Sequence, residues 1–227
     1  MVQMSPRARR IAAVAAFAVA AIFVTQEIYL LLAVDPSSAA ELIKSGVQPL
    51  NLLRARLMFY VFFLVLTVQA ALFARTRSFP ALLGLVVGSI GCTMELSYRA
   101  LELEGLFARW LPAYLQAHDD AARQLAHARL DAFYDLVMVA YRVIGVTAPM
   151  TSLCFALATF RGATRLERTL GILFFVNCAR QSLPFVVPLL PALSGLAGTL
   201  FIFVIAPVYV VAGLWLWLSP SETAARL

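Results

Sequence analysis

Six long apolar stretches restrict what this chain can fold into. They cover residues 11–34, 57–73, 79–98, 133–160, 170–188 and 196–218. About 20 apolar residues in a helix cross the hydrocarbon core of a bilayer, so stretches of this length indicate membrane spans. Backbone groups within the bilayer must be satisfied internally, and single stretches of this length achieve that as helices. The sequence therefore predicts an all-α polytopic membrane helix bundle of about six transmembrane helices, forming one integral membrane domain over residues 1–227.

The composition supports the same class. Hydrophobic residues make up 62% of the chain and charged residues 13%, with a mean hydropathy of +0.86. A soluble domain carries about 25% charged residues. The net charge of +6 comes from arginines dispersed at the ends of the apolar stretches. We attribute that charge to membrane topology and expect no nucleic-acid partner.

The short connecting segments predict an orientation. If successive expected helices run in opposite directions, most of the arginines in short loops fall on one side of the membrane. They are Arg7, Arg9, Arg10, Arg75, Arg77, Arg161, Arg165, Arg168 and Arg226. Most acids lie on the opposite side. Because short cytoplasmic loops are enriched in Lys and Arg, we expect a multi-pass protein of the cell inner membrane with both termini in the cytoplasm.

The longer outer loop has a helical pattern of its own. Its apolar residues recur at helical spacing: Leu103, Leu106, Phe107, Trp110, Leu111 and Tyr114. This pattern predicts a short amphipathic interfacial helix lying at the outer membrane surface. Asp119 or Asp120 is expected to cap the helix that leads into the span at 133–160.

Polar and charged residues inside the expected spans are the candidate functional site. Each charge at a helix centre costs about 2.5 to 3.5 kcal/mol on insertion scales, so such residues are rare. The expected set within the spans is Glu27, Glu95, Asp135, Arg142, Asn177 and Arg180, and Arg99 joins it from the outer end of the span at 79–98. Helix direction puts this set in the outer half of the bundle. Asp135 and Arg142 are seven residues apart and share one helix face, so we expect Arg142 to pair with Asp135 or Glu95.

Two interpretations of this polar network remain open. In the first, interhelical ion pairs fix packing and register. In the second, the network lines a cavity that binds a small polar or amphipathic ligand. Gly84, Gly88 and Cys92 recur every four residues, so they predict a small-residue face where a neighbouring helix approaches closely.

Several chemistries lack the residues they need. Two histidines, His118 and His127, cannot supply four axial ligands for a di-haem cytochrome. Lys44 is the only lysine and lies in a loop, which excludes a retinal Schiff base in a span. Three cysteines without metal or redox spacing are typical of packing residues. We expect no catalytic residue, no metal site and no cofactor.

Short motifs recur near the ends of the expected helices. They are Arg54, Tyr98-Arg99-Ala100-Leu101-Glu102, Tyr114-Leu115-Gln116-Ala117, Asp131 with Tyr134 and Asp135, and Leu170-Gly171. In this order they resemble a widespread group of bacterial six-helix membrane proteins catalogued as a domain of unknown function. The resemblance covers most of the chain. It implies a six-helix fold and no particular activity.

Three hypotheses for function follow, from different classes. The sparse chemistry favours a non-enzymatic regulator or sensor that holds a cytoplasmic regulatory protein at the membrane. The buried charges favour the alternative of a small transporter or ligand-binding bundle with a polar site in the outer half of the membrane. A lipid-modifying enzyme using Glu27, Glu95 or Asp135 as acid or base ranks last, because no activating partner can be placed. The expected partners are thus the lipid bilayer, a cytoplasmic regulatory protein and a small ligand.

Overall fold

The computed structural model describes residues 4–32, 36–186 and 196–218, and every regular element in these ranges is a helix. The elements are α1 (Pro6–Leu32), α2 (Ala39–Ser45), α3 (Pro49–Thr76), α4 (Phe79–Ala100), the π-helix η1 (Leu101–Trp110), α5 (Leu111–Leu115), α6 (Asp120–Thr159), α7 (Arg165–Val186) and α8 (Leu196–Leu218). The all-α class expected from the apolar stretches is therefore confirmed.

Four helical stretches are long and apolar enough to cross a membrane: Pro6–Leu30, Pro49–Thr76, Phe79–Leu115 and Asp120–Thr159. They cover most of each of the first four expected spans, and such helices contact lipid. The fifth and sixth expected spans are also helical, as α7 and α8. Polar residues such as Asn177, Arg180 and Gln181 interrupt α7, and α8 carries no charged residue. The expected ends at Val34 and Pro188, like the C-terminal segment with Arg226, lie outside the described residues.

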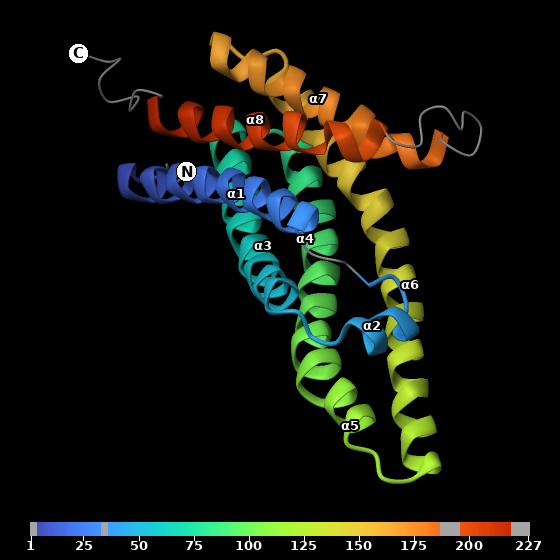
Figure 1. Ribbon diagram of the computed structural model, residues 1–227. Coiled ribbons are helices and arrows are strands. Elements are labelled where there is room, and N and C mark those ends of the chain that lie inside the picture. The colour runs from blue at the N-terminus through green and yellow to red at the C-terminus, as the bar shows by residue number, and fades with distance from the viewer. Residues whose placement is uncertain (1–3, 33–35, 187–195, 219–227) are drawn as a thin grey trace.

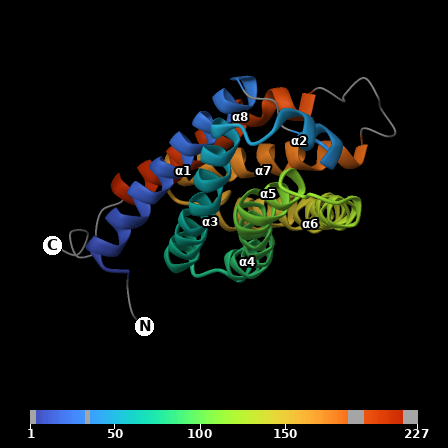
Figure 2. The ribbon, with the colours of Figure 1, turned by 60° about the horizontal axis from the view of Figure 1, so that its bottom comes forward.

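The six longer helices close into a ring. In the order α1, α3, α4, α6, α7 and α8, each packs against the next, and α8 packs against α1 again. Figure 1 shows α3, α4 and α6 running along the long direction of the molecule, with α1, α7 and α8 crossing them obliquely at one end. Figure 2 shows the same group from below, with α4, α5 and α6 at the near end.

The amphipathic segment of the outer loop is helical but is not a separate interfacial helix, which corrects the sequence expectation. η1 and α5 continue α4 without a break, giving one helical stretch over Phe79–Leu115. The physical reason is burial against protein. Leu106 and Leu111 pack with Ala39 and Leu42 of α2 and with Leu130 of α6, so the apolar stripe faces a local core.

α6 begins thirteen residues earlier than the expected span, at Asp120 rather than residue 133. The carboxylate of Asp119 accepts a hydrogen bond from the Ala122 N–H at 2.7 Å, which confirms the expected cap. At 1.5 Å per residue, α6 is about 60 Å long, about twice the thickness of the hydrocarbon core. The C-terminal half of α6 is therefore long enough to cross the hydrocarbon core. The N-terminal half extends beyond that layer, together with its neighbours η1, α5 and α2.

Small residues set the distances between helices. A methyl group at Gly84 would lie 3.1 Å from Cys154 Cβ of α6, and one at Gly91 would lie 2.7 Å from Thr147 Oγ1. Gly88 faces α3 instead, where the Gln69 amide occupies the space of a side chain. The expected small-residue face thus exists, and it serves two neighbours.

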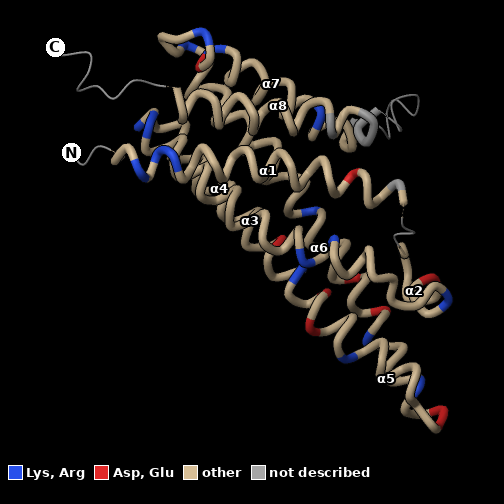
Figure 3. Tube along the Cα trace, turned by 60° about the vertical axis from the view of Figure 1, so that its left-hand side comes forward, with Lys and Arg blue, Asp and Glu red and all other residues tan. Residues whose placement is uncertain are grey.

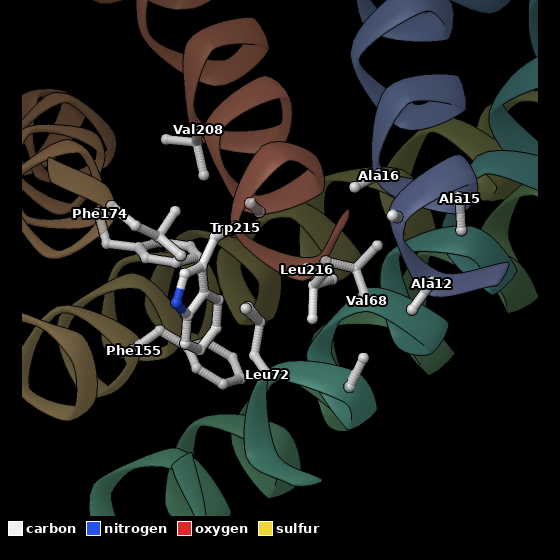
Figure 4. Close-up of a cluster of buried hydrophobic side chains, with 14 of the residues drawn as sticks. Ala12, Ala15, Ala16, Val68, Leu72, Phe155, Phe174, Val208, Trp215 and Leu216 are labelled. Atoms are coloured by element: carbon white, nitrogen blue, oxygen red, sulfur yellow. The ribbon is translucent and has the colours of Figure 1, made fainter. Parts of the chain in front are cut away.

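The main hydrophobic core lies where α1 and α8 cross α3, α6 and α7. Figure 4 shows Ala12 and Ala16 of α1 close to Leu216 of α8, with Trp215 between Leu72, Phe155 and Phe174. Alanines on α1 let α8 approach, and the large rings fill the space beneath. This core closes one end of the ring.

Gly171 should not tolerate a side chain. A methyl group there would lie 2.6 Å from both the backbone N and Cα of Phe160, which cannot move without opening the α6–α7 turn. We expect Gly171→Ala to lower the free energy of unfolding in detergent by about 1 to 3 kcal/mol, the usual range for overpacking. Gly145→Ala is the matched control, because its methyl group meets only Phe185 Cζ at 3.5 Å. Equal stabilities for the two variants would contradict this packing.

Candidate functional site

The ring of helices surrounds a partly open cavity of about 460 Å³. All six ring helices contribute to its wall, for example Phe23 from α1, Val65 from α3, Cys92 from α4, Thr147 from α6 and Ile205 from α8, with α7 supplying polar groups. The cavity exists because the helices touch their ring neighbours and leave the centre open. It is the concave site around which the expected polar residues gather.

The wall of the cavity changes character along the bundle. At one end it is formed by Leu72, Phe155, Phe174 and Val208, which also belong to the main hydrophobic core. Polar groups begin about one helical turn from these residues, at Gln69 and Asn177, and the remaining wall also carries Gln26, Glu95, Arg99, Arg180 and Gln181 among apolar side chains such as Phe23, Met58 and Phe201. The cavity wall is therefore amphipathic, apolar at one end and mixed along the rest.

A chain of hydrogen bonds lines the α6–α7 side. The Asn177 amide donates to Ser152 Oγ at 3.0 Å, and the Ser152 hydroxyl donates to Gln181 Oε1 at 2.9 Å. Arg180 Nε donates to Asn177 Oδ1 at 3.2 Å, and its guanidinium lies 4.9 Å from the centre of the Phe201 ring. These contacts connect α6, α7 and α8.

Four charged side chains form a buried cluster beside the polar end. Arg99 Nη1 donates to Glu102 Oε2 at 2.6 Å, and Arg99 Nε lies 3.6 Å from Glu95 Oε2. Glu102 also pairs with Arg54 of α3, at 3.8 Å. All four side chains are at least nine-tenths buried. We call this set the Arg99 cluster; it contains two positive and two negative charges.

Glu95 belongs both to the Arg99 cluster and to the cavity. Its Oε2 is buried without a hydrogen-bond partner, because the 3.6 Å separation from Arg99 Nε is too long for a hydrogen bond. Gln69 Oε1 and Gln26 Oε1, on the same wall, are likewise buried without hydrogen bonds among the described residues. Buried polar atoms normally find a partner, so these three oxygen atoms, on residues that line the cavity, mark the least satisfied part of the bundle.

The structure brings some of the expected site residues together and separates others. Glu95, Arg99, Asn177 and Arg180 line the cavity, whereas Glu27 is not among its lining residues. Asp135 and Arg142 share a face of α6, but that face is exposed, and neither side chain makes an ion pair within the described part of the chain. The expected pairing of Arg142 with Asp135 or Glu95 is therefore absent.

The periodicity of α6 explains this difference. Its buried positions include Phe133, Val137, Ala140, Thr147 and Thr151, which repeat every three, four or seven residues. Asp135 and Arg142 each follow a buried position by two residues, which turns them about 200° around the helix axis. Seven-residue spacing correctly gave them one face, but it could not say which face points inward.

Sequence reasoning missed three contributors. Arg54 and Glu102 appeared to lie outside the spans, because α3 and α4 continue further than the apolar stretches indicate. Gln69 is a single amide within an apolar stretch. The spacing of Glu95, Arg99 and Glu102, at i, i+4 and i+7, was the available signal for ion pairs along one helix face.

A double-mutant cycle tests the Arg99 cluster. Arg99→Leu alone leaves Glu95 and Glu102 buried without their shared cation, so we expect a loss of about 3 to 5 kcal/mol in unfolding free energy in detergent. Combining it with Glu102→Leu should cost clearly less than the sum of the two single changes. The exposed pair Arg123–Asp120 is the control, and Arg123→Leu should cost less than about 1 kcal/mol. Additive effects at Arg99 and Glu102 would show that the cluster is not coupled.

Comparison with known proteins yields no match. No protein-family model, curated protein or solved structure matches this chain. The resemblance to a six-helix bacterial family stays a prediction, and the function has to be inferred from the cavity and its charges.

Proposed function

We propose that this chain is a multi-pass inner-membrane protein that binds a small amphipathic molecule in its central cavity. The amphipathic wall of that cavity is the observation that carries the proposal. Its volume of about 460 Å³ falls within the range of about 300 to 1,000 Å³ that ligand pockets occupy. Ligand pockets are mostly apolar with a few placed polar groups, and this wall has the same character.

The depth of the polar end within the membrane supports a lipid-like orientation for a molecule bound in the cavity. The apolar part of α6 runs over residues 143–159, about 26 Å at 1.5 Å per residue, which is close to the thickness of the hydrocarbon core. Thr147 of α6 packs on Gly91 of α4, so Glu95, one turn further along α4, lies near the start of this apolar part. A bound molecule would then hold its head near the headgroup region and its tail in the apolar layer.

We propose further that all six ring helices cross the membrane, with both termini cytoplasmic. The closed ring supports this, because α7 and α8 complete the same bundle as the four long apolar helices. Charge supports the orientation. Figure 3 shows basic residues gathered at the end where α1 begins and the α6–α7 turn lies, whereas acids and bases mix at the tip near α5. At the basic end, Glu167 is the only acid within the described ranges.

Reporter fusions test this topology. Fusions after Arg10, Ala163 and Leu227 should report a cytoplasmic location, and fusions near Gly46 and Gln116 should report an external one. A cytoplasmic signal near Gln116, or an external one after Ala163, would contradict the orientation. An external signal after Leu227 alone would mean that α7 and α8 do not both cross.

The regulator or sensor hypothesis remains a prediction that adds to this proposal. It requires a cytoplasmic protein that contacts the basic end, and ligand binding at the opposite end would be the signal. Asp135 cannot serve as an acid or base within the cavity, because it lies on the exposed face of α6. The enzyme hypothesis therefore loses one of its three candidate groups.

Ligand binding can be tested with short amphiphiles that share one tail. We would measure the unfolding temperature of the purified protein in nanodiscs with 1,2-octanediol, octylamine or octanoate added, because a ligand that binds the folded state raises it. At least one compound should stabilise the wild type. Ala148→Phe should abolish the effect, since Ala148 lines the cavity and a ring there fills it.

Val146→Phe is the matched control for Ala148→Phe. Val146 lies two residues away on the same helix and is exposed, so the same ring points out of the cavity. This variant should respond to the amphiphiles as the wild type does. If no compound stabilises the wild type, or if Ala148→Phe responds fully, the cavity is not a binding site.

A further inference from the structure

We infer that the molecule bound in the cavity has an anionic head group, a carboxylate or a phosphate, with Arg180 as its cationic partner. The inference rests on the proposed function and adds the chemistry of the ligand's head. Two observations carry it. Arg180 has no ion pair within the described part of the chain, and the hydrogen bonds around it leave donors, not acceptors, beside the cavity.

The charges of the described cavity wall are paired except at Arg180. Three of the described lining residues are charged: Glu95, Arg99 and Arg180. Glu95 and Arg99 pair with each other, whereas Arg180 makes no ion pair with any described acid. An arginine keeps its positive charge in a protein, and a charge within a membrane span is costly. An anion on the ligand would supply the missing negative charge.

The guanidinium of Arg180 also has hydrogen-bond donors to offer. Its Nε donates to Asn177 Oδ1 at 3.2 Å, and neither Nη atom makes a hydrogen bond with the described residues. Neither Nη atom is among the buried polar atoms that lack a partner, so both reach space that a ligand can occupy. The Phe201 ring, 4.9 Å from the guanidinium carbon, helps to hold the group in place. A planar guanidinium can hold two oxygen atoms of a carboxylate or phosphate at once.

The hydrogen bonds that begin at Arg180 determine how the neighbouring amides are oriented. An arginine only donates, so the Asn177 oxygen accepts from Arg180 and the Asn177 nitrogen donates to Ser152 Oγ. Ser152 then uses its single hydrogen to donate to Gln181 Oε1. The Gln181 Nε2 group is left with two hydrogens and no hydrogen-bond partner among the described residues. Because Arg180 and Gln181 both line the cavity, this part of the wall favours a head that accepts hydrogen bonds.

An anionic head meets both requirements at Arg180. An ammonium head would bring a second positive charge and would offer donors to donors. An alcohol would accept a hydrogen bond but would leave the charge of Arg180 uncompensated. Hydrogen bonds between ionised partners are about twice as strong as those between neutral ones, so an anion gains the most at this position.

The test compares four heads on one octyl tail: octanoate, octyl phosphate, 1,2-octanediol and octylamine. Each is added to the purified protein in phosphatidylcholine nanodiscs, and the apparent Kd follows from the dependence of unfolding temperature on concentration. We expect at least one anion to bind about tenfold more tightly than the diol, the fold-change for a hydrogen bond to a charged group. Octylamine should bind more weakly than the diol. The tighter of the two anions identifies the head as a carboxylate or a phosphate.

Substitution of Arg180 tests its role directly. Arg180→Gln removes the charge and should erase the preference for the anion, while the diol still binds. Arg142→Gln is the matched control, because Arg142 is an exposed arginine of α6 that is not among the described lining residues. It removes the same charge, and the preference for the anion should stay. If Arg180→Gln does not fold, Gln181→Met is the second variant, since it removes the Nε2 donor and should weaken binding of the anion several-fold.

The outcomes distinguish this inference from the proposed function. If the diol or octylamine binds as tightly as the better anion, the anionic head is wrong while the cavity remains a binding site. A preference for the anion that survives Arg180→Gln, or unchanged anion binding in Gln181→Met, would overturn the role of this wall. If none of the probes binds in a manner that Ala148→Phe abolishes, the proposed function and this inference fail together.

Discussion

The position of the Arg99 guanidinium between two carboxylates is the interaction on which the rest of the bundle depends. Arg99 lies on α4, Glu102 lies one turn later on η1, and Arg54 reaches Glu102 from α3. Charges that leave water need partners, and each partner here comes from a fixed position on a helix. The Arg99 cluster therefore fixes the register of α3 against α4. It also holds Glu95 at the cavity wall, so the packing and the candidate site share one constraint.

The cavity follows from how the helices close their ring. At the basic end, alanines and glycines bring helices together, as Ala12 and Ala16 do for α8. Further along, the polar side chains Gln69, Asn177 and Arg180 lie at the centre, and the helices remain apart around them. Protein interiors are close-packed, and voids of this size are uncommon. A polar, open centre within an otherwise apolar bundle is better explained by occupancy than by imperfect packing.

The sequence predicts the class of fold well and the inner geometry poorly. Apolar stretches of span length identified the helices, because burial in a membrane demands apolar side chains over a fixed length. Glu95 and Asn177 were expected inside the bundle, since polar groups there are too costly to be incidental, and both are buried. Which face of α6 packs against the other helices could not be predicted, because both of its faces carry apolar residues. Met138 and Val139 are exposed, whereas Phe133 and Val137 are buried. The continuation of α4 through η1 and α5 was also missed. Leu106 and Leu111 are buried there against α2 and α6, and this burial depends on contacts distant in sequence.

The most direct measurement is a high-resolution density map of the chain, extracted from its native membrane into lipid nanodiscs without added ligand. The account predicts elongated non-protein density inside the ring, with its polar end beside Glu95 and Arg180 and its other end among Leu72, Phe155 and Phe174. A ring that has closed on itself, with side chains filling the centre, would contradict it.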